Sequence, residues 1–458
     1  MSERVKTKLG DILDKIIDHR GLTPKKLGSD FVSYGIPVLS AKHIKDGQII
    51  NKNDFRYVTP EIYDLWMPEK LKKGDILLTS EAPLGEVFFL RENADYCLGQ
   101  RLFGLRAKSN ILDSRFFYYL VKSPYFQVQL HARATGTTAQ GIRQSELVKI
   151  EIEFPPLPEQ KAIAYILGTL DDKIDLNRRM NETLEEMAKA IFKSWFVDFD
   201  PVIDNALKAG NPIPDALAEK AARRRAILEK LEKEDPNLPK FPPEVTRLFP
   251  DSFENSPLGP IPKGWMVDTM DNHFRIIMGQ SPPGNTYNED GNGLPFYQGR
   301  IDFGFRFPSR RMYCTAPTRV ANKSDTLITV RAPVGAINKA LERCCIGRGV
   351  AAIRHITGYR SYTYYFVHSL RPFFERFEAE GTVFGSITKK DFTLIKYVMP
   401  PIELIERFES MCKPIDEMIE RNECEIRTLA TLRDTLLPKL ISGQIRIKDA
   451  EKFVGEML

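Results

Sequence analysis

The segments "LLTSEAPLGEV" (residues 77–87) and "LITVRAPVGAI" (residues 327–337) are two copies of one pattern within a single chain. Five residues recur unchanged: Leu77, Thr79, Ala82, Pro83 and Gly85 return as Leu327, Thr329, Ala332, Pro333 and Gly335. An apolar run that ends at a Pro-x-Gly turn is typical of a strand and the loop that follows it. One position changes its sign of charge, from Glu81 to Arg331. The pair therefore predicts two modules with a common framework and different surfaces.

The repeat continues in order along nearly the whole chain, which favours a duplication over a chance likeness of generic turns. The spacing between the copies falls in steps from 258 to 245 residues, as small loop deletions would produce. Further matches are "RGLTP" (20–24) with "MGQSP" (278–282), "CLGQRLFGLR" (97–106) with "CIGRGVAAIR" (345–354), and "GTTAQGIRQSEL" (136–147) with "GTVFGSITKKDF" (381–392).

Bulk composition describes an ordinary globular protein with room for two to three domains. The 458 residues are 42% hydrophobic and 28% charged, and the net charge of +5 leans mildly toward an anionic partner. The six cysteines show neither CxxC spacing nor a histidine partner, so neither a metal site nor a disulfide framework is expected. The N-terminus lacks the apolar core of a signal peptide, and no apolar run could span a membrane. We therefore expect a cytoplasmic protein.

Each copy divides into a strand-rich part and a helical part. Short β-branched and aromatic runs between turn residues predict compact α/β (α+β) modules, and two long helices that form an antiparallel coiled coil alternate with them. The expected divisions are module 1 (residues 1–155), a first helical spacer (156–200), a Pro-rich linker with a short charged helix (201–263), module 2 (264–400) and a second helical spacer (401–458).

The helical parts carry apolar stripes with a seven-residue repeat, as paired helices do. Asn177 and Asn422 fall at equivalent positions, where a buried Asn would fix the register. The alternative is that each helix packs only on its own module. "TLDD" at Thr169 and the turn at Pro414 predict that the long helices begin there, after a short preceding helix. The predicted seam residues are Leu170, Ile174, Asn177, Asn181, Leu184, Ile191, Ile415, Ile419, Asn422, Ile426, Leu429 and Leu436.

Motifs for catalysis are missing from the sequence. There is no GxxxxGK[ST] phosphate loop and no Gly-rich turn of a dinucleotide or adenosylmethionine pocket. The Pro-Pro pairs at 155–156 and 400–401 lack the Asn or Asp with which amino-methyltransferases hold a base. The histidines are scattered along the chain. We expect a binding protein with no catalytic residue, no metal site and no cofactor of its own.

Three segments carry a resemblance to a known family: "PPLPEQ" (155–160), "FKSWFVDFDPV" (192–202) and "LLPKLISG" (436–443). With the alternation of modules and helices, they make the whole chain closely resemble the specificity subunit of type I restriction–modification systems. The resemblance implies that each module reads one half of a split target in double-stranded DNA. It also implies that the helices set the gap and dock two methyltransferase subunits.

The chemistry would then belong to partner subunits. The resemblance implies adenine N6-methylation by methyltransferase subunits that use S-adenosylmethionine, and cleavage by restriction subunits that use ATP and Mg. Two other hypotheses stay open at this stage: an orphan DNA-binding or regulatory protein without such partners, and a stand-alone modification enzyme. The second copy departs from the first at "PPIELI" (400–405), so its docking surface is expected to match a partner less tightly.

The candidate DNA-binding residues lie in loops that combine a Gly or Pro turn with cationic or polar side chains, which suit base edges and phosphates. For each residue alone, a solvated surface side chain is the alternative. The candidates are Arg20, Thr23, Lys25, Lys26, Lys42, Arg133, Thr137, Gln140 and Arg143 in module 1, and Gln298, Arg300, Arg306, Arg310, Arg311, Arg348, Thr382, Ser386 and Lys389 in module 2.

Overall fold

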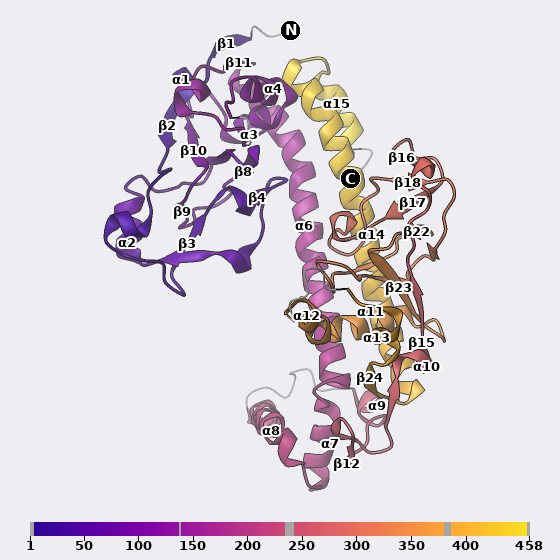
Figure 1. Cartoon of the computed structure of the whole chain (residues 1–458). Helices are drawn as coiled ribbons and strands as arrows, with labels where there is room; N and C mark the ends of the chain where they lie inside the picture. Colours follow the sequence, from indigo (N-terminus) through magenta and orange to yellow (C-terminus); the bar gives the residue numbers. More distant parts are fainter. Residues whose placement is uncertain (1–3, 137–138, 234–241, 380–385, 456–458) are drawn as a thin grey trace. The chain divides into compact units, whose positions relative to one another are not determined.

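The computed structural model describes residues 4–136, 139–233, 242–379 and 386–455. The chain forms two compact units. Unit 1 combines Met1–Asp175 with Ile426–Leu458, and unit 2 is Leu176–Glu425. Each unit therefore contains one module and part of both long helices, α6 (Leu157–Phe196) and α14 (Ile402–Ser442), which are drawn in Figure 1.

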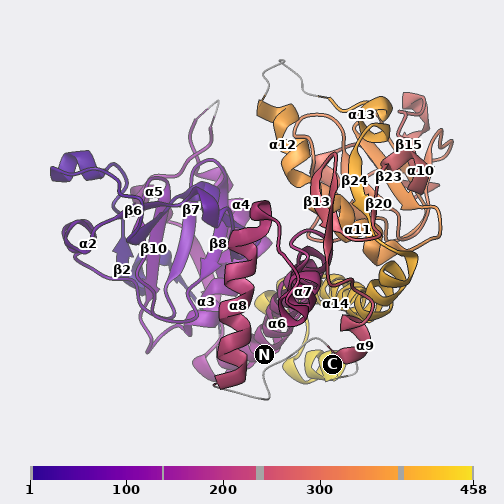
Figure 2. The ribbon, with the colours of Figure 1, turned by 90° about the horizontal axis from the view of Figure 1, so that it is seen from below.

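Unit 1 is built around an antiparallel four-stranded sheet of order β2-β10-β7-β8, whose strands lie side by side in Figure 2. A smaller sheet joins β6, β3 and β9, and β1 pairs with β11. Its elements are β1 (Val5–Lys8), α1 (Leu9–Ile12), β2 (Leu13–Ile17), η1 (Pro24–Leu27), β3 (Ile36–Leu39), η2 (Ala41–His43), β4 (Ile44–Lys45), β5 (Gln48–Ile49), η3 (Lys52–Asp54), β6 (Arg56–Val58), α2 (Pro60–Trp66), β7 (Ile76–Ser80), β8 (Leu84–Phe89), β9 (Cys97–Leu98), β10 (Leu102–Ala107), α3 (Ser114–Lys122), α4 (Pro124–Ala132), α5 (Gln144–Leu147), β11 (Glu151–Phe154) and α15 (Ile447–Gly455).

Unit 2 repeats this plan, with the sheet β15-β23-β20-β21 in place of β2-β10-β7-β8 and β14 paired with β24. Its elements are α7 (Asp200–Ala209), η4 (Asp215–Leu217), α8 (Ala218–Lys233), α9 (Pro243–Thr246), β12 (Phe253–Ser256), β13 (Gly259–Pro262), β14 (Met266–Thr269), α10 (Met270–His273), β15 (Phe274–Met278), η5 (Gly284–Thr286), β16 (Tyr287–Asn288), β17 (Leu294–Tyr297), η6 (Arg300–Asp302), β18 (Tyr313–Cys314), β19 (Val320–Ala321), β20 (Thr326–Thr329), β21 (Ile337–Lys339), β22 (Cys344–Ile346), β23 (Val350–His355), α11 (Arg360–Ser369), α12 (Arg371–Ala379), α13 (Lys389–Thr393) and β24 (Lys396–Met399).

The internal repeat extends to single hydrogen bonds. The Thr79 hydroxyl accepts from the backbone N–H of Glu86 (2.8 Å), and Thr329 accepts from Ala336 (3.0 Å) at the equivalent place. Both hairpins pass through a cis Ala-Pro peptide, followed by a glycine with positive φ. The recurring Thr, Ala, Pro and Gly therefore keep the same hydrogen bond, cis peptide and glycine conformation in both hairpins.

Both long helices begin earlier than predicted. α6 starts at Leu157 and α14 at Ile402, with no separate short helix before them. Thr169 does not cap a helix start, because its hydroxyl donates to the Tyr165 carbonyl one turn back (2.9 Å). Pro414 is exposed inside α14, so it does not mark a helix start.

The two helices pair in antiparallel orientation, which confirms the predicted fold class. In unit 2, Asn177 Nδ2 donates to Glu425 (2.8 Å), and Asn422 Nδ2 donates to the Asn181 side chain (2.8 Å). As the residue number rises along α6, the number of the contacting residue on α14 falls, which is the pattern of antiparallel helices. Each unit has its own apolar core that joins side chains of both helices with module residues, so the helices pack on each other and on the modules.

The predicted seam positions are at least half-buried throughout. Leu184, Ile191 and Ile415 are half-buried, and the remaining nine are buried. Asn177 and Asn422 are equivalent in the repeat but have different partners. Asn177 bonds to Glu425, and Asn422 bonds to Asn181.

A buried aspartate anchors module 1 to the helices. Asp171 on α6 accepts from the hydroxyl of Tyr119 on α3 (2.7 Å) and from Arg433 Nη1 on α14 (2.7 Å). Its carboxylate is therefore shared by the module and both helices. Burial raises the pKa of the Tyr119 phenol, and the Asp171 charge adds to this shift, so the phenol stays protonated and donates.

The equivalent aspartate anchors module 2. Asp416 on α14 accepts from the hydroxyl of Tyr365 (2.9 Å) on α11 and from Lys339 Nζ (2.8 Å) on β21. Arg306 also contacts this carboxylate, and its Nη1 lies 3.4 Å from Glu185 on α6. Burial opposes ionisation of Asp416, but the charges of Arg306 and Lys339 outweigh it and lower the pKa of this carboxyl to about 2.

The prediction that Arg306 contacts DNA is therefore wrong. Its side chain is 0% exposed, lies over the Tyr364 ring at 3.6 Å and is ion-paired with Asp416. A guanidinium enclosed by its own module and both helices has no access to a base or a phosphate. In the linker, Arg224 on α8 is likewise ion-paired, with Asp204 at 2.5 Å.

Among the residues that the structure describes, no helix combines the length and the apolar character needed to cross a membrane.

Asp416→Asn should destabilise unit 2 by about 3–5 kcal/mol, because it leaves Arg306 and Lys339 as buried cations without their main carboxylate. Urea unfolding followed by a probe in unit 2 measures this change. In the parent protein the contribution of Asp416 is present above about pH 4 and is lost as the pH falls toward about 2, since the folded-state pKa is lowered. The variant should lack this acid-dependent loss.

Glu417→Gln is the matched control, because this exposed neighbour on α14 should change stability by less than about 0.5 kcal/mol. An equal effect of the two substitutions would contradict the anchoring role of Asp416.

Candidate nucleic-acid interface

Each module contains one short parallel strand pair whose carboxyl ends place two loops together. β3 pairs in parallel with β9 (Leu39 with Leu98), and β17 pairs in parallel with β22 (Tyr297 with Ile346). Carboxyl ends of parallel strands meet at one edge of a sheet, a frequent place for binding loops. We call the loops gathered there edge 1 (residues 20–26, 40–42, 80–85, 99–101 and 139–143) and edge 2 (278–281, 298–300, 330–335, 347–349 and 386–389).

Backbone and side-chain hydrogen bonds join the loops of edge 1. The Ser80 N–H donates to the Arg101 carbonyl (2.8 Å), and the Ile142 N–H donates to the Ser80 carbonyl (2.9 Å). Arg20 Nη1 then donates to the Ile142 carbonyl (3.2 Å). Four loops that are distant in sequence therefore form one continuous surface.

Edge 2 has the same framework at equivalent residues. The Val330 N–H donates to the Gly349 carbonyl (2.9 Å), and the Ile387 N–H donates to the Val330 carbonyl (3.0 Å). Gly349 is required by close packing, because an added Cβ would lie 2.1 Å from the Gln298 carbonyl oxygen.

A short 3-10 turn begins next to each parallel pair, and its third residue bonds back to the start of the turn. In edge 1, His43 Nδ1 accepts from the Ser40 N–H (3.0 Å), and burial lowers the pKa of His43, which keeps the imidazole neutral and able to accept. In edge 2, Asp302 Oδ2 accepts from the Gln298 N–H (2.6 Å). One backbone turn is thus held by different side chains.

A pocket of about 260 Å³ opens beside edge 1. Aromatic side chains Phe31 and Trp66 line it together with polar groups from three edge loops. The polar lining includes Thr23, Ser40, Lys42, Asp54, Arg56 and Gln100. Hydrogen-bond donors and acceptors next to aromatic faces suit the contacts that proteins make with nucleic acids.

The module 1 candidates differ in how strongly internal contacts hold them. Arg20 is tied to Asp18 (2.8 Å) and lies over the Phe103 ring (3.9 Å), and Thr23 caps the turn η1. Lys25 and Lys26 are exposed on η1. Lys42 is exposed and lies 3.5 Å from Asp54.

The remaining module 1 candidates come from the segment after α4. Gln140 and Arg143 are exposed on either side of the Gly141–Ile142 backbone that pairs with β7, and Arg133 is half-exposed at the end of α4. Thr137 lies outside the described residues.

In module 2 the structure gathers Gln298, Arg300 and Arg348 at edge 2, all exposed. Arg311 lies 3.2 Å from Asp302, next to these residues, whereas Arg310 pairs with Glu342 (2.6 Å). Ser386 and Lys389 are exposed at the end of edge 2. Thr382 lies outside the described residues.

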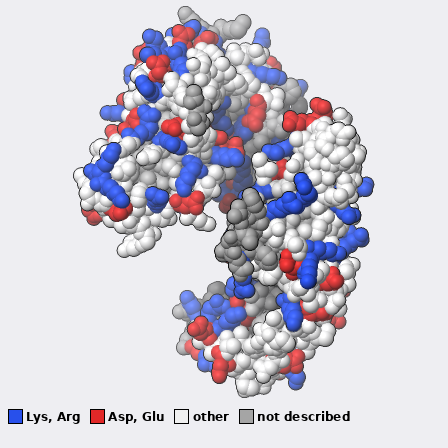
Figure 3. All heavy atoms as spheres, viewed as in Figure 1, with Lys and Arg blue, Asp and Glu red and all other residues white. Residues whose placement is uncertain are grey.

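Three residues at the edges were missing from the predicted set: Gln100 and Arg101 in edge 1 and Arg331 in edge 2. The alignment of "LGQR" (98–101) with "IGRG" (346–349), combined with the parallel pairing that only the structure reveals, finds Gln100 and Arg101. The repeated Ala-Pro segment finds Arg331. In the view of Figure 3, Lys and Arg side chains are interspersed with Asp and Glu on each unit. No unbroken basic patch is visible among the coloured side chains on the face that Figure 3 draws.

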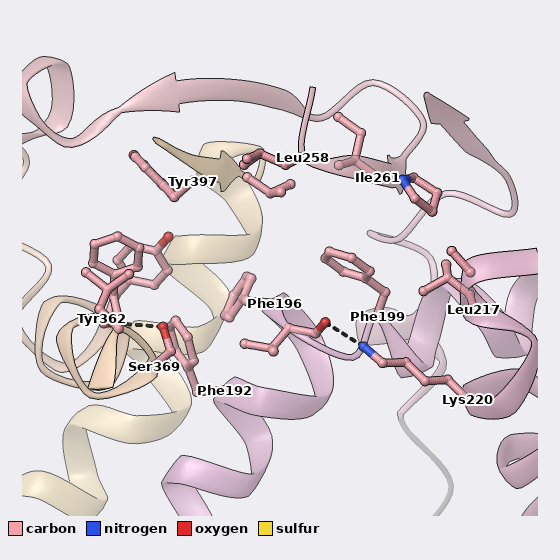
Figure 4. A pocket seen from close by; sticks show the side chains of 16 residues that line it. Phe192, Phe196, Phe199, Leu217, Lys220, Leu258, Ile261, Tyr362, Ser369 and Tyr397 are labelled. Atoms are coloured by element: carbon pink, nitrogen blue, oxygen red, sulfur yellow. Dashed lines mark hydrogen bonds between the residues drawn. The ribbon is translucent and has the colours of Figure 1, made fainter. Parts of the chain in front are cut away.

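A second feature is an aromatic pocket of about 410 Å³ at the C-terminal end of α6 in unit 2. Figure 4 shows Phe192 and Phe196 from α6, Tyr362 from α11 and Tyr397 from β24 around it. Lys220 Nζ on α8 donates to the Val197 carbonyl (3.1 Å) and so satisfies the helix end.

Unit 1 has a pocket of about 320 Å³ at the equivalent end of α14. Ile441, Ser123 and Pro124 line it where Phe196, Ser369 and Leu370 line the aromatic pocket of unit 2. Arg4 donates to the Ile441 carbonyl at this helix end. Each unit therefore offers one concave surface at the end of a long helix, and that of unit 2 is the more aromatic.

Among the described residues there is no group of three or more His, Cys, Asp or Glu side chains placed to hold a metal ion.

Comparisons with known proteins agree on one family. A family model described as "Type I restriction modification DNA specificity domain" matches residues 1–186. The chain is 30% identical over 453 residues to a putative type I restriction enzyme specificity subunit, MjaX, of Methanocaldococcus jannaschii, covering 96% of this chain and 93% of that protein. It is 26% identical to the HindI specificity subunit of Haemophilus influenzae over 88% of this chain and 94% of the relative.

A crystal structure of a type I restriction–modification S subunit from M. genitalium has a similar fold, with a TM-score of 0.51 at 19% identity and 96% coverage of each chain. The sequence relationship spans nearly the whole length of the chain and its relatives. The chain therefore belongs to the family of type I restriction enzyme specificity subunits.

Proposed function

We propose that edge 1 and edge 2 each read one half of a split double-stranded DNA target. The observation that carries this proposal is that both edges are built on the same backbone framework but present different side chains. A shared framework keeps the loops at the same distance from DNA, while changed donors and acceptors select different bases. The candidates at the edges include Arg, Lys, Gln and Thr, which bind base edges and phosphates.

We further propose that residues 1–155 and 264–400 are the two recognition domains and that the helical parts 156–200 and 401–458 space them. What supports a ruler is the length of the helices, since the 40 residues of α6 extend about 60 Å at 1.5 Å per residue. One DNA turn is about 34–36 Å. A rigid pair of this length would leave unread base pairs between the halves.

Methyltransferase subunits are the proposed partners at the helix ends. The two pockets at the C-terminal ends of α6 and α14 support this part of the proposal, because they are equivalent surfaces, as two copies of one partner would require. The linker residues 201–263 border the pocket of unit 2 through Leu217 and Leu258. Methyl transfer with S-adenosylmethionine, and cleavage driven by ATP and Mg, are proposed to belong to partner subunits in the cytoplasm.

Mapping of methylated adenines tests the split target. The chain is co-expressed with its cognate methyltransferase subunit, and the expected result is one motif with two defined halves around a fixed gap. Gly349→Ala should weaken selection of one half only, since its Cβ would force edge 2 away from the Gln298 carbonyl. Gly284→Ala, which has open space around the added methyl, is the control and should leave both halves unchanged.

Methylation of a continuous motif would contradict the proposal of two readers. An intact complex that methylates nothing would instead favour an orphan binding protein, which direct DNA-binding assays would then characterise.

Helix length should set the gap. Seven residues inserted after Asp175 in α6 and seven after Glu425 in α14 preserve the seven-residue seam and add about 10 Å. At about 3.4 Å per base pair, the gap should grow by about three base pairs while both halves stay the same. Methylation mapping measures the gap, and a change in either half-site would contradict the ruler.

The aromatic pocket should contribute to partner binding. Leu258→Asp places a charge at the rim of the pocket, at a side chain that is 47% exposed, and should weaken binding of the methyltransferase subunit at least about tenfold. Ile356→Asp, at a side chain that is 64% exposed and outside the pocket, is the control. Binding is measured by calorimetry or size-exclusion chromatography, and equal affinities of the two variants would exclude this pocket.

A further inference from the structure

The charge reversal between Glu81 and Arg331 occurs at structurally equivalent points of the two edges. Glu81 forms a backbone bridge with Gly141, and Arg331 forms the same kind of bridge with Ser386. Both residues directly precede the cis Ala-Pro peptide of their hairpin. The reversal therefore changes the charge of the binding edge while the backbone bridge and the cis Ala-Pro peptide are kept.

Two neighbouring positions change charge as well. Gln100 of edge 1 corresponds to Arg348 of edge 2, and Arg101 corresponds to Gly349. With Glu81 and Arg331 included, these three positions carry a net charge of zero in edge 1 (Glu81 and Arg101) and +2 in edge 2 (Arg331 and Arg348). Edge 2 is thus the more attractive of the two for an anionic backbone at these positions.

Within edge 1 the two charges neutralise each other. Arg101 Nη2 lies 3.5 Å from Glu81 Oε1, and the side chains are 48% and 36% exposed. Such an exposed ion pair contributes little to stability, so its main effect is to reduce the charge available to a ligand. Arg101 also has φ of 67°, a left-handed conformation that non-glycine residues seldom adopt and that is typical of functional positions.

In edge 2 the corresponding arginines are displayed to solvent. Arg331 is exposed, and so is Arg348, whose Nε donates to the Ser281 hydroxyl at 3.3 Å. This contact with a neutral side chain fixes the direction of the guanidinium without neutralising it. Guanidinium groups bind phosphate oxygens in a two-point geometry.

We propose that Arg331 and Arg348 bind DNA phosphates at the half-site of module 2, whereas Glu81 withholds Arg101 from phosphate at the half-site of module 1. This inference rests on the proposed function and specifies what these residues contact. Module 2 then holds the duplex largely through its backbone at these positions, and module 1 depends more on contacts that distinguish bases.

Salt dependence measures this difference, because each phosphate contact releases condensed counterions and steepens the plot of log K against log salt by about 0.9. The full-length chain is titrated with its mapped target duplex over a series of salt concentrations. Arg331→Gln and Arg348→Gln should each reduce the slope by about 0.9, and the double variant by about 1.8.

Substitution of Glu81 in edge 1 should change the slope in the opposite direction. Glu81→Gln should tighten binding and steepen the slope by about 0.9, because Arg101 becomes available to a phosphate. Arg101→Gln should leave the slope of the parent protein unchanged but remove the gain when it is combined with Glu81→Gln. This double-variant cycle separates a released arginine from a general change of charge.

Two substitutions at the far ends of the same hairpins are the matched controls. Glu92→Gln, which follows β8, raises the net charge by one as Glu81→Gln does. Arg343→Gln, which follows β21, lowers it by one as Arg331→Gln does, and both lie away from the edges. Control variants that shift the slope as much as the edge variants would overturn the inference. If the edge variants bind the target specifically with unchanged slopes, the inference is overturned and the proposed function stays intact. If the parent protein binds target and scrambled duplex with equal affinity, both the inference and the proposed function are overturned.

Discussion

Two buried aspartates at equivalent positions, Asp171 and Asp416, hold each module to the helices in its unit. Each accepts a hydrogen bond from a tyrosine of the module, Tyr119 or Tyr365. Each also binds a cation, Arg433 in unit 1 and Arg306 in unit 2. Because a buried ion pair adds little net stability, we interpret these clusters as devices that fix orientation. The proposed recognition of two half-sites at a set spacing would require such a fixed attachment.

The same anchor is made differently in the two copies. In unit 1 the cation comes from the partner helix, whereas in unit 2 Arg306 and Lys339 come from the module itself. Helix-borne Glu185 then completes the cluster in unit 2. The module can therefore vary in sequence while the aspartate and the tyrosine keep the interface with the helices. The edges follow the same rule, since their backbone bonds recur and their side chains change.

Sequence patterns predicted the duplication, the fold class and the antiparallel helices, because each of these depends on a periodic or repeated local signal. They failed where the decisive partner is distant in the chain. Arg306 lies in an arginine-rich loop typical of a DNA contact, yet its carboxylate partner is Asp416. The parallel pairing of Leu39 with Leu98, which defines edge 1, has no local signal either. A threonine hydroxyl can cap a helix start or bond the preceding turn from inside a helix, and the local sequence at Thr169 does not distinguish the two roles.

The most direct test of the account exchanges one module alone. Residues 1–155 are replaced by the corresponding module of a relative whose target differs, with both helices kept as they are, and methylated adenines are mapped in cells with the cognate methyltransferase. The account predicts that one half of the motif changes, while the other half and the gap are retained. A motif that changes in both halves, or a gap that changes with the module, would contradict the claim that each edge reads its half independently on a helical spacer.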